Sequence, residues 1–526
     1  MEPTSLIPRK RSFGRGPRVL GLGIREWLVL IIYCGMVCFA VLYYRQSEDE
    51  ARAWVLSRSF PLGTLIFHMI RYEGHPGLYY FLLWTLSHAG VSFVCINWLS
   101  AVSASGAIYL LLRFSPFPFY LKALIPFGFY LGYQYAVDAR SYALFALFGF
   151  TAVNLYRRAP DIPVAMAVVL ALFANISLHA TMVAIGLAVA YAAQFRAEGF
   201  SVACEPRRAW HTWLSLGIFG ASILFVLFCV WPVKYMHSPA VVSRRIVRRL
   251  FGPTSERPSH DSVTSSAYFP HTSVESRTQV ASPTAIVNPP PQGMGDRVRK
   301  ALIYPIATLP ALAALFEVLV ALYLLRRRRA VLLLPFALLS YFFIVVYVQV
   351  WHSGLIWVTL ILLLWAAWDE EANPLSWTLQ NAVAVLLASL CALQLPWTIE
   401  AIRYERSHDT FPAKSAALFL SNLPPSNRID GNQIAFTVMP YFSHYIFLDH
   451  GEARFVAHTG YPADISIADF VSEHADEILL QTSSVTAMDR NELYDAGYTE
   501  KHVFCGAPFF PNRPIKLVCI SIFEKN

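Results

Sequence analysis

Charged side chains are scarce in this chain. Asp, Glu, Lys and Arg make up 14% of its 526 residues, whereas about 25% is usual for soluble domains. Hydrophobic residues reach 56% and aromatic residues 14%. A composition this apolar excludes an ordinary soluble protein and indicates a polytopic membrane protein.

Several signatures of soluble function are also missing. No C-x-x-C pair predicts a zinc site, and there is no glycine-rich phosphate loop or cytoplasmic nucleotide-binding domain. The pI is about 9.0, but the basic residues stand in short loops and at segment ends, as in Arg326 to Arg329. This placement favours membrane orientation over nucleic-acid binding. A disulfide between Cys505 and Cys519 can form if the C-terminal part faces an oxidising compartment.

Apolar segments approach or reach the roughly 20 residues that cross a hydrocarbon core. We predict about eleven of them, at 27–44, 94–113, 119–136, 141–156, 162–178, 180–195, 210–233, 300–325, 330–349, 354–368 and 376–396. Placing Lys and Arg inside puts the N-terminus in the cytoplasm, and an odd number of spans puts the C-terminus outside. The first span is expected to be a retained signal anchor.

The predicted fold class is a polytopic α-helical membrane protein with a small C-terminal extracytoplasmic α/β domain. Its predicted parts are a basic cytoplasmic N-terminus (1–26), a transmembrane domain (27–399) and the α/β domain (400–526). Within the transmembrane domain, 45–93 is expected to be an external juxtamembrane loop. A second external loop, 234–299, is rich in Ser, Pro, Thr and Arg and is expected to be partly disordered.

Three polar clusters fall on the external face in this topology. Each alone is explained equally well as ordinary loop charge. Together, they bring carboxylates, a histidine and arginines to the place where apolar helices meet water, as a site for a charged, lipid-attached substrate requires. The clusters are Glu48, Asp49 and Glu50 with Arg52; Glu73 with His75; and Asp138 with Arg140.

These residue types suit transfer of a sugar from a lipid phosphate. A carboxylate such as Asp49 can take the proton of the acceptor hydroxyl or amine. Arg140 and His352 are candidates to bind the departing phosphate. The ring of Tyr135 or Tyr142 can pack on a sugar face, although aromatic residues are common at membrane interfaces. No spacing predicts a metal site and no cofactor is required, but the clustered acids leave a divalent metal open.

Three motifs carry a resemblance to a known family. "DEARAW", "HPGLYYFLLW" and "YQYAVDARSYALFALF" resemble motifs of bacterial integral-membrane glycosyltransferases of the GT-C class. This class (glycosyltransferase family 39 and relatives) includes the protein O-mannosyltransferases and the lipid A aminoarabinose transferase. The resemblance covers about residues 20–200 well and 300–400 loosely.

The resemblance implies roles for the polar residues. Asp49 and Glu50 match an Asp-Glu pair whose first acid lies at the reacting centre. Glu73 and His75 match the acidic and basic positions before a proline. These matches make Asp49 and Glu50 the predicted catalytic residues, and Glu73 and His75 predicted substrate-binding residues.

The remaining matches depart from the family pattern. Asp138 and Arg140 match a Glu-Ala-Arg stretch, with Asp in place of the commoner Glu, and Ser141 stands where Pro or Met is frequent. "WHSG" at 351–354 replaces an Arg-Tyr pair that often opens a late span. Asp138, Arg140, Tyr142 and His352 complete the predicted substrate-binding set.

The resemblance also implies a GT-C-like bundle of transmembrane helices, with the active site on the external face, and a function. A glycosyltransferase of this class uses a polyprenyl-phosphate-linked sugar and an extracytoplasmic lipid, glycan or protein acceptor, and no nucleic acid. It would lie in the bacterial inner membrane, contact membrane lipid and act in cell-envelope glycosylation.

Three other functions stay open. A transporter predicts internal repeats and polar groups at mid-membrane, where we find only Glu317 and no repeat. A surface-polysaccharide ligase or polymerase would also use lipid-linked sugars and a large external loop such as 234–299. The last alternative is a non-catalytic membrane scaffold.

Overall fold

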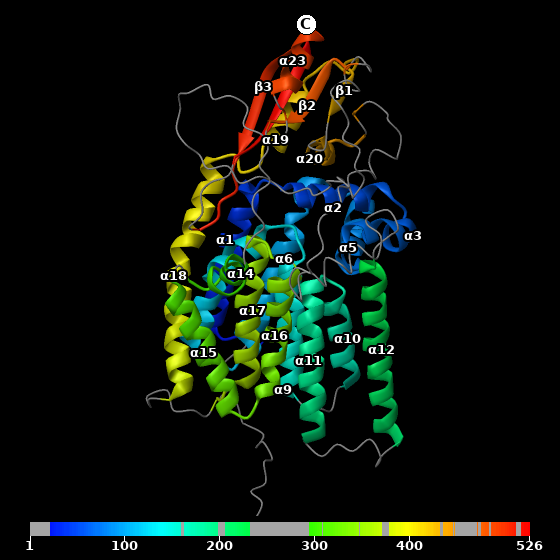
Figure 1. Cartoon of the computed structure of the whole chain (residues 1–526). Coiled ribbons are helices and arrows are strands. Elements are labelled where there is room, and N and C mark those ends of the chain that lie inside the picture. The colour runs from blue at the N-terminus through cyan, green and yellow to red at the C-terminus, as the bar shows by residue number, and fades with distance from the viewer. Residues whose placement is uncertain are drawn as a thin grey trace, which may run out of the picture.

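A bundle of helices carries a small sheet domain at one end (Figure 1). The computed structural model describes residues 21–158, 163–197, 206–231, 294–307, 309–346, 348–370, 378–431, 435–444, 446–447, 471, 475–482, 485, 487–511 and 517–526. The predicted loop at 234–299 lies outside these residues except at its end, as does the predicted N-terminus (1–26) except from residue 21.

Every described helix or strand element up to residue 420 is helical. The first half contains α1 (Ile24–Tyr43), α2 (Glu48–Ser59), α3 (Leu62–Thr64), η1 (Leu65–Met69), α4 (Ile70–Glu73), α5 (Gly77–His88), η2 (Phe93–Cys95), α6 (Asn97–Phe114), α7 (Phe119–Leu124), η3 (Ile125–Phe127), η4 (Tyr130–Gln134), α8 (Tyr135–Val137), α9 (Tyr142–Arg158), α10 (Pro163–Ala174), α11 (Leu178–Ala197) and α12 (Pro206–Val230). The second half contains α14 (Met294–Val298), η5 (Arg299–Ile303), α15 (Pro310–Arg326), η6 (Ala330–Leu332), α16 (Leu333–Tyr341), η7 (Phe342–Val346), α17 (Val350–Ala367), α18 (Leu379–Ser407) and α19 (Ala413–Leu420).

The predicted fold class is confirmed: a polytopic helical bundle carries a small C-terminal α/β domain. Each apolar segment predicted from the sequence falls on helical elements. Among the described residues, five helices are long and apolar enough to cross a membrane alone, and shorter apolar helices accompany them. The five are Ile24–Tyr43, Phe93–Phe114, Leu178–Phe195, Trp210–Val230 and Leu379–Ser407.

The segment predicted at 119–136 is broken into α7, η3, η4 and α8. Pro126 lies in η3, and the chain is extended at Gly128. A side chain on Gly132 would press within about 3.0 Å of the Phe127 backbone. Proline and close backbone packing therefore interrupt a run that is apolar enough to cross as one helix.

Helix α17 lies at the centre of the bundle. Every residue from His352 to Trp368 is buried, as expected for a helix that is apolar on all sides. Two arginines cap its C-terminal carbonyl groups: Arg157 donates to Trp365 O (3.1 Å), and Arg329 donates to Ala366 O (2.8 Å). These cations stabilise the negative end of the helix dipole. They also hold the C-terminal end of α17 in place, and with it the position of the helix along its axis.

Helices α2, α3 and α5 lie between the bundle and the sheet domain (Figure 1). α2 packs its two faces against different partners. Ala51 and Trp54 belong to the core of the bundle, whereas Val55 belongs to the core of the C-terminal domain. Arg58 donates to Phe442 O (2.7 Å). α2 is thus held from both sides.

The C-terminal domain is built on a four-stranded sheet. Its described elements are β1 (Ile429–Gly431), α20 (Ala435–Val438), η8 (Met439–Tyr441), β2 (Glu477–Gln481), α23 (Ala487–Asp495), β3 (Tyr498–Gly506) and β4 (Val518–Lys525). The strand order is β1-β2-β4-β3, with β1 parallel to β2 and the other pairs antiparallel. Cys505 and Cys519 face each other across β3 and β4 and form a disulfide.

Gly354 allows α17 to pack closely against Tyr130 of η4. An added Cβ there would clash with the ring of Tyr130, whereas a Cβ at Gly217 on α12 would meet nothing within 4 Å. We predict that Gly354→Ala lowers the free energy of unfolding by about 1–3 kcal/mol through overpacking. Gly217→Ala should be neutral or stabilising by up to about 1 kcal/mol. Thermal unfolding in detergent measures both, and equal melting temperatures would contradict the packing argument.

Candidate functional site

The site begins at the N-terminus of α2, which is closed by a capping box. The sequence Ser47-Glu48-Asp49-Glu50 has the S-x-x-E pattern of this motif. The backbone N–H of Ser47 donates to Oε2 of Glu50 at 2.5 Å, and the reciprocal bond is present. Glu50 therefore turns back into the protein, while Asp49 next to it faces outward.

The carboxylate of Glu50 is fully buried and accepts four hydrogen bonds. Besides Ser47, Tyr44 OH donates to Oε2 (3.1 Å). Asn97 Nδ2 (3.1 Å) and the backbone N–H of Ala139 (2.6 Å) both donate to Oε1. All four partners are donors, so the arrangement fits an ionised carboxylate. This group joins the start of α2 to α6 and to the loop after α8.

That loop is fixed at each backbone group from Val137 to Ala139. Asn97 Nδ2 donates to Val137 O (2.6 Å), and the Ser100 hydroxyl donates to Asp138 O (2.7 Å). Tyr79 OH donates to Ala139 O. The loop that carries Asp138 and Arg140 is therefore held by side chains of α5 and α6.

Asp49 and Arg140 form an ion pair. Arg140 Nη1 lies 3.4 Å from Asp49 Oδ2, with the Asp49 side chain 47% exposed and that of Arg140 16% exposed. Burial opposes the charge of Arg140, but Asp49 together with Tyr142, Tyr79 and Asp138 outweighs it and raises the pKa of the guanidinium. The pair presents a solvent-accessible carboxylate beside a cation that stays charged.

Asp138, in contrast to the accessible and charged Asp49, is buried and favours its protonated form. Its Oδ1 is buried and accepts no hydrogen bond. Burial, with the neighbouring charge of Glu50, raises the pKa of Asp138 well above its ordinary value. Burial also raises the pKa of Glu50, but there hydrogen bonds from Ser47 and Ala139 counteract it. A proton shared by this pair therefore belongs on Asp138.

Glu73 and His75 lie near the same ion pair. Burial raises the pKa of Glu73, and the charges of Arg52 and Arg140 partly offset this. Burial, aided by the charge of Arg140, lowers the pKa of His75 to about 4. The imidazole of His75 is thus neutral at pH 7 and can act as a hydrogen-bonding group but not as a cation.

His352, the last of the predicted site residues, lies in the first turn of α17. His352 is 5% exposed and Tyr142 is 3% exposed, with ring centroids 5.9 Å apart. The Tyr135 ring packs against Tyr142 in a tilted arrangement, with ring centroids 4.8 Å apart, and its hydroxyl donates to Trp351 O (2.9 Å). The loop of Asp138 and the start of α17 are therefore joined through aromatic rings.

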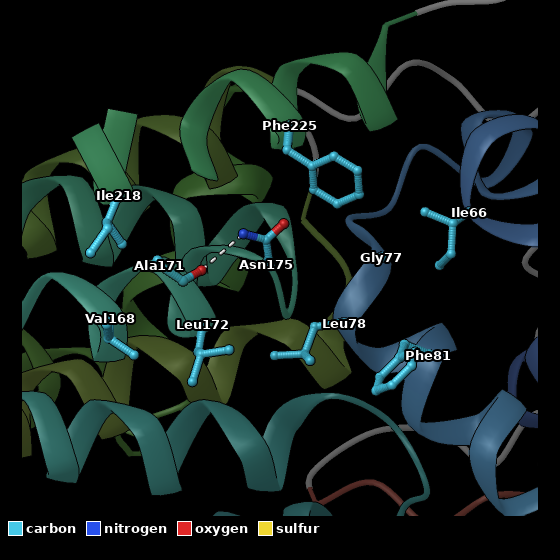
Figure 2. Close-up of a pocket in the computed structure, with 10 residues that line it drawn as sticks. All are labelled: Ile66, Gly77, Leu78, Phe81, Val168, Ala171, Leu172, Asn175, Ile218 and Phe225. Atoms are coloured by element: carbon cyan, nitrogen blue, oxygen red, sulfur yellow. Dashed lines mark hydrogen bonds between the residues drawn. The ribbon is translucent and has the colours of Figure 1, made fainter. Parts of the chain in front are cut away.

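An apolar cavity of about 380 Å³ opens beside the site. Figure 2 shows its lining, which comes from η1, α5, α10 and α12. Gly77 lines the cavity and follows His75 by two residues. The next residue, Leu78, donates its backbone N–H to Asn175 O (3.1 Å). The cavity therefore lies within a few residues of the polar cluster. Its lining residues are Ile66, Gly77, Leu78, Phe81, Val168, Ala171, Leu172, Asn175, Ile218 and Phe225.

The structure thus brings the predicted residues together in one cluster with different surroundings, and this cluster is called the rim: Asp49, Glu50, Glu73, His75, Asp138, Arg140, Tyr142 and His352. Asp49 is accessible, the carboxylate of Glu50 accepts four hydrogen bonds from the protein, and His352 is buried. The sequence interpretation missed Asn97, Ser100 and the capping box. Of these, only the S-x-x-E pattern was a readable signal. Within the described ranges, no group of three His, Cys, Asp or Glu side chains could hold a metal ion.

Comparison with known proteins shows the fold. No protein-family model matches the chain, and no curated protein matches it. The crystal structure of ArnT from Cupriavidus metallidurans in the apo state is similar, with a TM-score of 0.52 and 13% sequence identity. The match covers 94% of this chain and 98% of that one. The GT-C-like fold predicted from the sequence motifs is therefore confirmed.

We predict that Glu50→Gln lowers the free energy of unfolding by about 2–4 kcal/mol, because the new amide leaves buried donors without an acceptor. Glu48→Gln is the matched control. Its partner Arg52 is 3.7 Å away and partly exposed, so its loss should cost under about 1 kcal/mol. Thermal or denaturant unfolding in detergent compares the two, and equal losses would argue against a special role for Glu50.

Asp138 should limit stability at neutral pH. Its folded pKa is above its unfolded value, so stability is fully present below about pH 4 and is lost as the pH rises from there. We predict that Asp138→Asn raises the melting temperature at pH 7.5 by about 2 °C or more, with a gain that shrinks towards pH 4. Asp409→Asn, at an exposed ion pair with Arg45, should show no such trend. A gain that does not change with pH would contradict this interpretation.

Proposed function

We propose that this protein is a membrane glycosyltransferase that moves a sugar from a polyprenyl-phosphate-linked donor to an extracytoplasmic acceptor. The observation that carries the proposal is the accessible carboxylate of Asp49, held against Arg140 beside an apolar cavity. The GT-C-like fold supports it, because ArnT is a lipid A aminoarabinose transferase of that class. The link to protein O-mannosyltransferases rests on the sequence motifs alone.

In the proposed reaction, Asp49 and Arg140 have separate roles. Asp49 takes the proton of the acceptor as its oxygen or nitrogen bonds to the anomeric carbon. The bond between that carbon and the donor phosphate breaks, and the phosphate leaves with the electron pair. Arg140 stabilises the charge that develops on the phosphate. The carboxylate of Glu50 already accepts four hydrogen bonds from the protein, so in this scheme Glu50 is a positioning residue.

Glu73, His75 and Tyr142 complete the proposed binding site. Neutral His75 can donate to or accept from a sugar hydroxyl. Glu73 keeps a buried Oε1 without a hydrogen-bond partner, which a donor group of the substrate would satisfy. The apolar cavity offers space for part of the polyprenyl chain, so the donor could stay in the membrane while its head reaches the rim.

Two features support an extracytoplasmic site in a bacterial inner membrane. The Cys505 and Cys519 disulfide needs an oxidising compartment. Arg326 to Arg329 lie at the far end of α15 from the sheet domain (Figure 1), which agrees with a cytoplasmic position for them. The proposed orientation therefore places the N-terminus in the cytoplasm and the C-terminal domain outside.

The proposal predicts that Asp49→Asn lowers the turnover rate by about 100-fold or more, the usual contribution of a positioned base. Mass spectrometry of envelope glycolipids and glycans would be compared in a deletion strain that carries each plasmid-borne variant at equal protein level. Wild type and the exposed control Glu400→Gln should restore the glycosylated species, and Asp49→Asn should not. Restoration by Asp49→Asn would refute the base, and unchanged glycans with altered solute uptake would favour a transporter.

A further inference from the structure

His179 is a buried histidine outside the motifs that the proposed reaction uses. It is the second residue of α11 and is 5% exposed. The turn before it is fixed, because the Ser177 hydroxyl accepts from the backbone N–H of Ala180 (3.2 Å) and Thr181 donates to Ala174 O (2.8 Å). The backbone that carries the imidazole of His179 is therefore held in one place.

Aromatic rings surround this imidazole. His352 lies 4.6 Å away, and Phe342 and Phe343 each lie 5.2 Å away, measured between ring centroids. The two phenylalanines open η7, a π-helical turn, and such turns often occur at functional sites. Packing alone would be served equally well by a phenylalanine at position 179.

The imidazole nevertheless keeps a polar atom that has no hydrogen-bond partner among the described residues. Nε2 of His179 is buried and has no hydrogen-bond partner. A buried polar atom in this state is costly and needs an explanation. A ligand that enters the site and bonds to Nε2 provides one.

His179 also belongs to the rim by position. The His352 ring contacts His179 on one side and Tyr142 on the other, and Tyr142 follows Arg140 by two residues. The charge of Arg140 reaches His179. The N-terminus of α17, the positive end of its helix dipole, lies at the same place. A cation and a helix N-terminus together favour an anionic oxygen.

We propose that Nε2 of His179 donates a hydrogen bond to a phosphate oxygen of the lipid carrier, so that His179 is a further binding residue of the site. The assignment rests on the proposed function, because it takes the lipid phosphate from there. It adds a buried contact beside His352, whereas Asp49 is exposed.

Binding of a polyprenyl phosphate and of the polyprenol of equal chain length to purified full-length protein tests this assignment. His179→Phe keeps the ring packing and removes Nε2. We expect its affinity for the phosphate to fall at least about tenfold, with affinity for the polyprenol unchanged. His179→Gln, which retains a donor, should recover part of the loss. His211→Phe, at an exposed position on α12, should bind as wild type does.

The outcomes separate this inference from the proposed function. If His179→Phe keeps the wild-type preference for the phosphate, His179 is not a phosphate ligand, and the proposed function stands. If His179→Phe loses affinity for both lipids or melts at a lower temperature, the residue has a packing role and the inference is wrong. If wild type itself does not distinguish phosphate from alcohol, the lipid-phosphate donor and the inference both fail.

Discussion

The buried carboxylate of Glu50 is the interaction on which the site depends. Moving a charge out of water costs several kcal/mol, and four donors from the end of α1, the α2 cap, α6 and the 137–140 loop offset this cost. Each donor is itself fixed by its own element. Glu50 therefore fixes the position of Asp49 in the first turn of α2 relative to the loop that carries Arg140. These two positions set the distance between Asp49 and Arg140.

The same interaction extends to the C-terminal domain. Tyr441 donates to Gln46 (3.1 Å), Gln46 donates to Asn97 (2.7 Å), and Asn97 donates to Glu50. Hydrogen-bonded chains of this kind strengthen one another in a low-dielectric interior. The sheet domain is thus joined to the rim by polar contacts as well as by the apolar packing of Val55. In contrast, Asp138 lacks a partner for Oδ1, and this local cost is one that functional sites commonly carry.

The sequence predicted the helical bundle, and its motifs marked residues that the structure brings together, because apolar length and polar clusters are local signals. The motifs located Asp49, Arg140 and His352 but did not distinguish the accessible acid from the buried one. That distinction depends on Asn97, a single polar residue at the start of an apolar helix, whose partners are 40 or more residues away. His179 carried no signal at all, because one histidine in an apolar segment usually only packs. The break at 119–136 was missed because close backbone approach is a tertiary property.

The two-sided packing of α2 has a consequence for synthesis of the chain. The helix that bears Asp49 emerges from the ribosome early, but Val55 and Arg58 gain their outer contacts only with residues beyond Ala413. The membrane helices between them must be inserted first. The outer packing of α2 is therefore completed as one of the last events of assembly, whereas the donors that hold Glu50 all lie between Tyr44 and Ala139 and are synthesised much earlier.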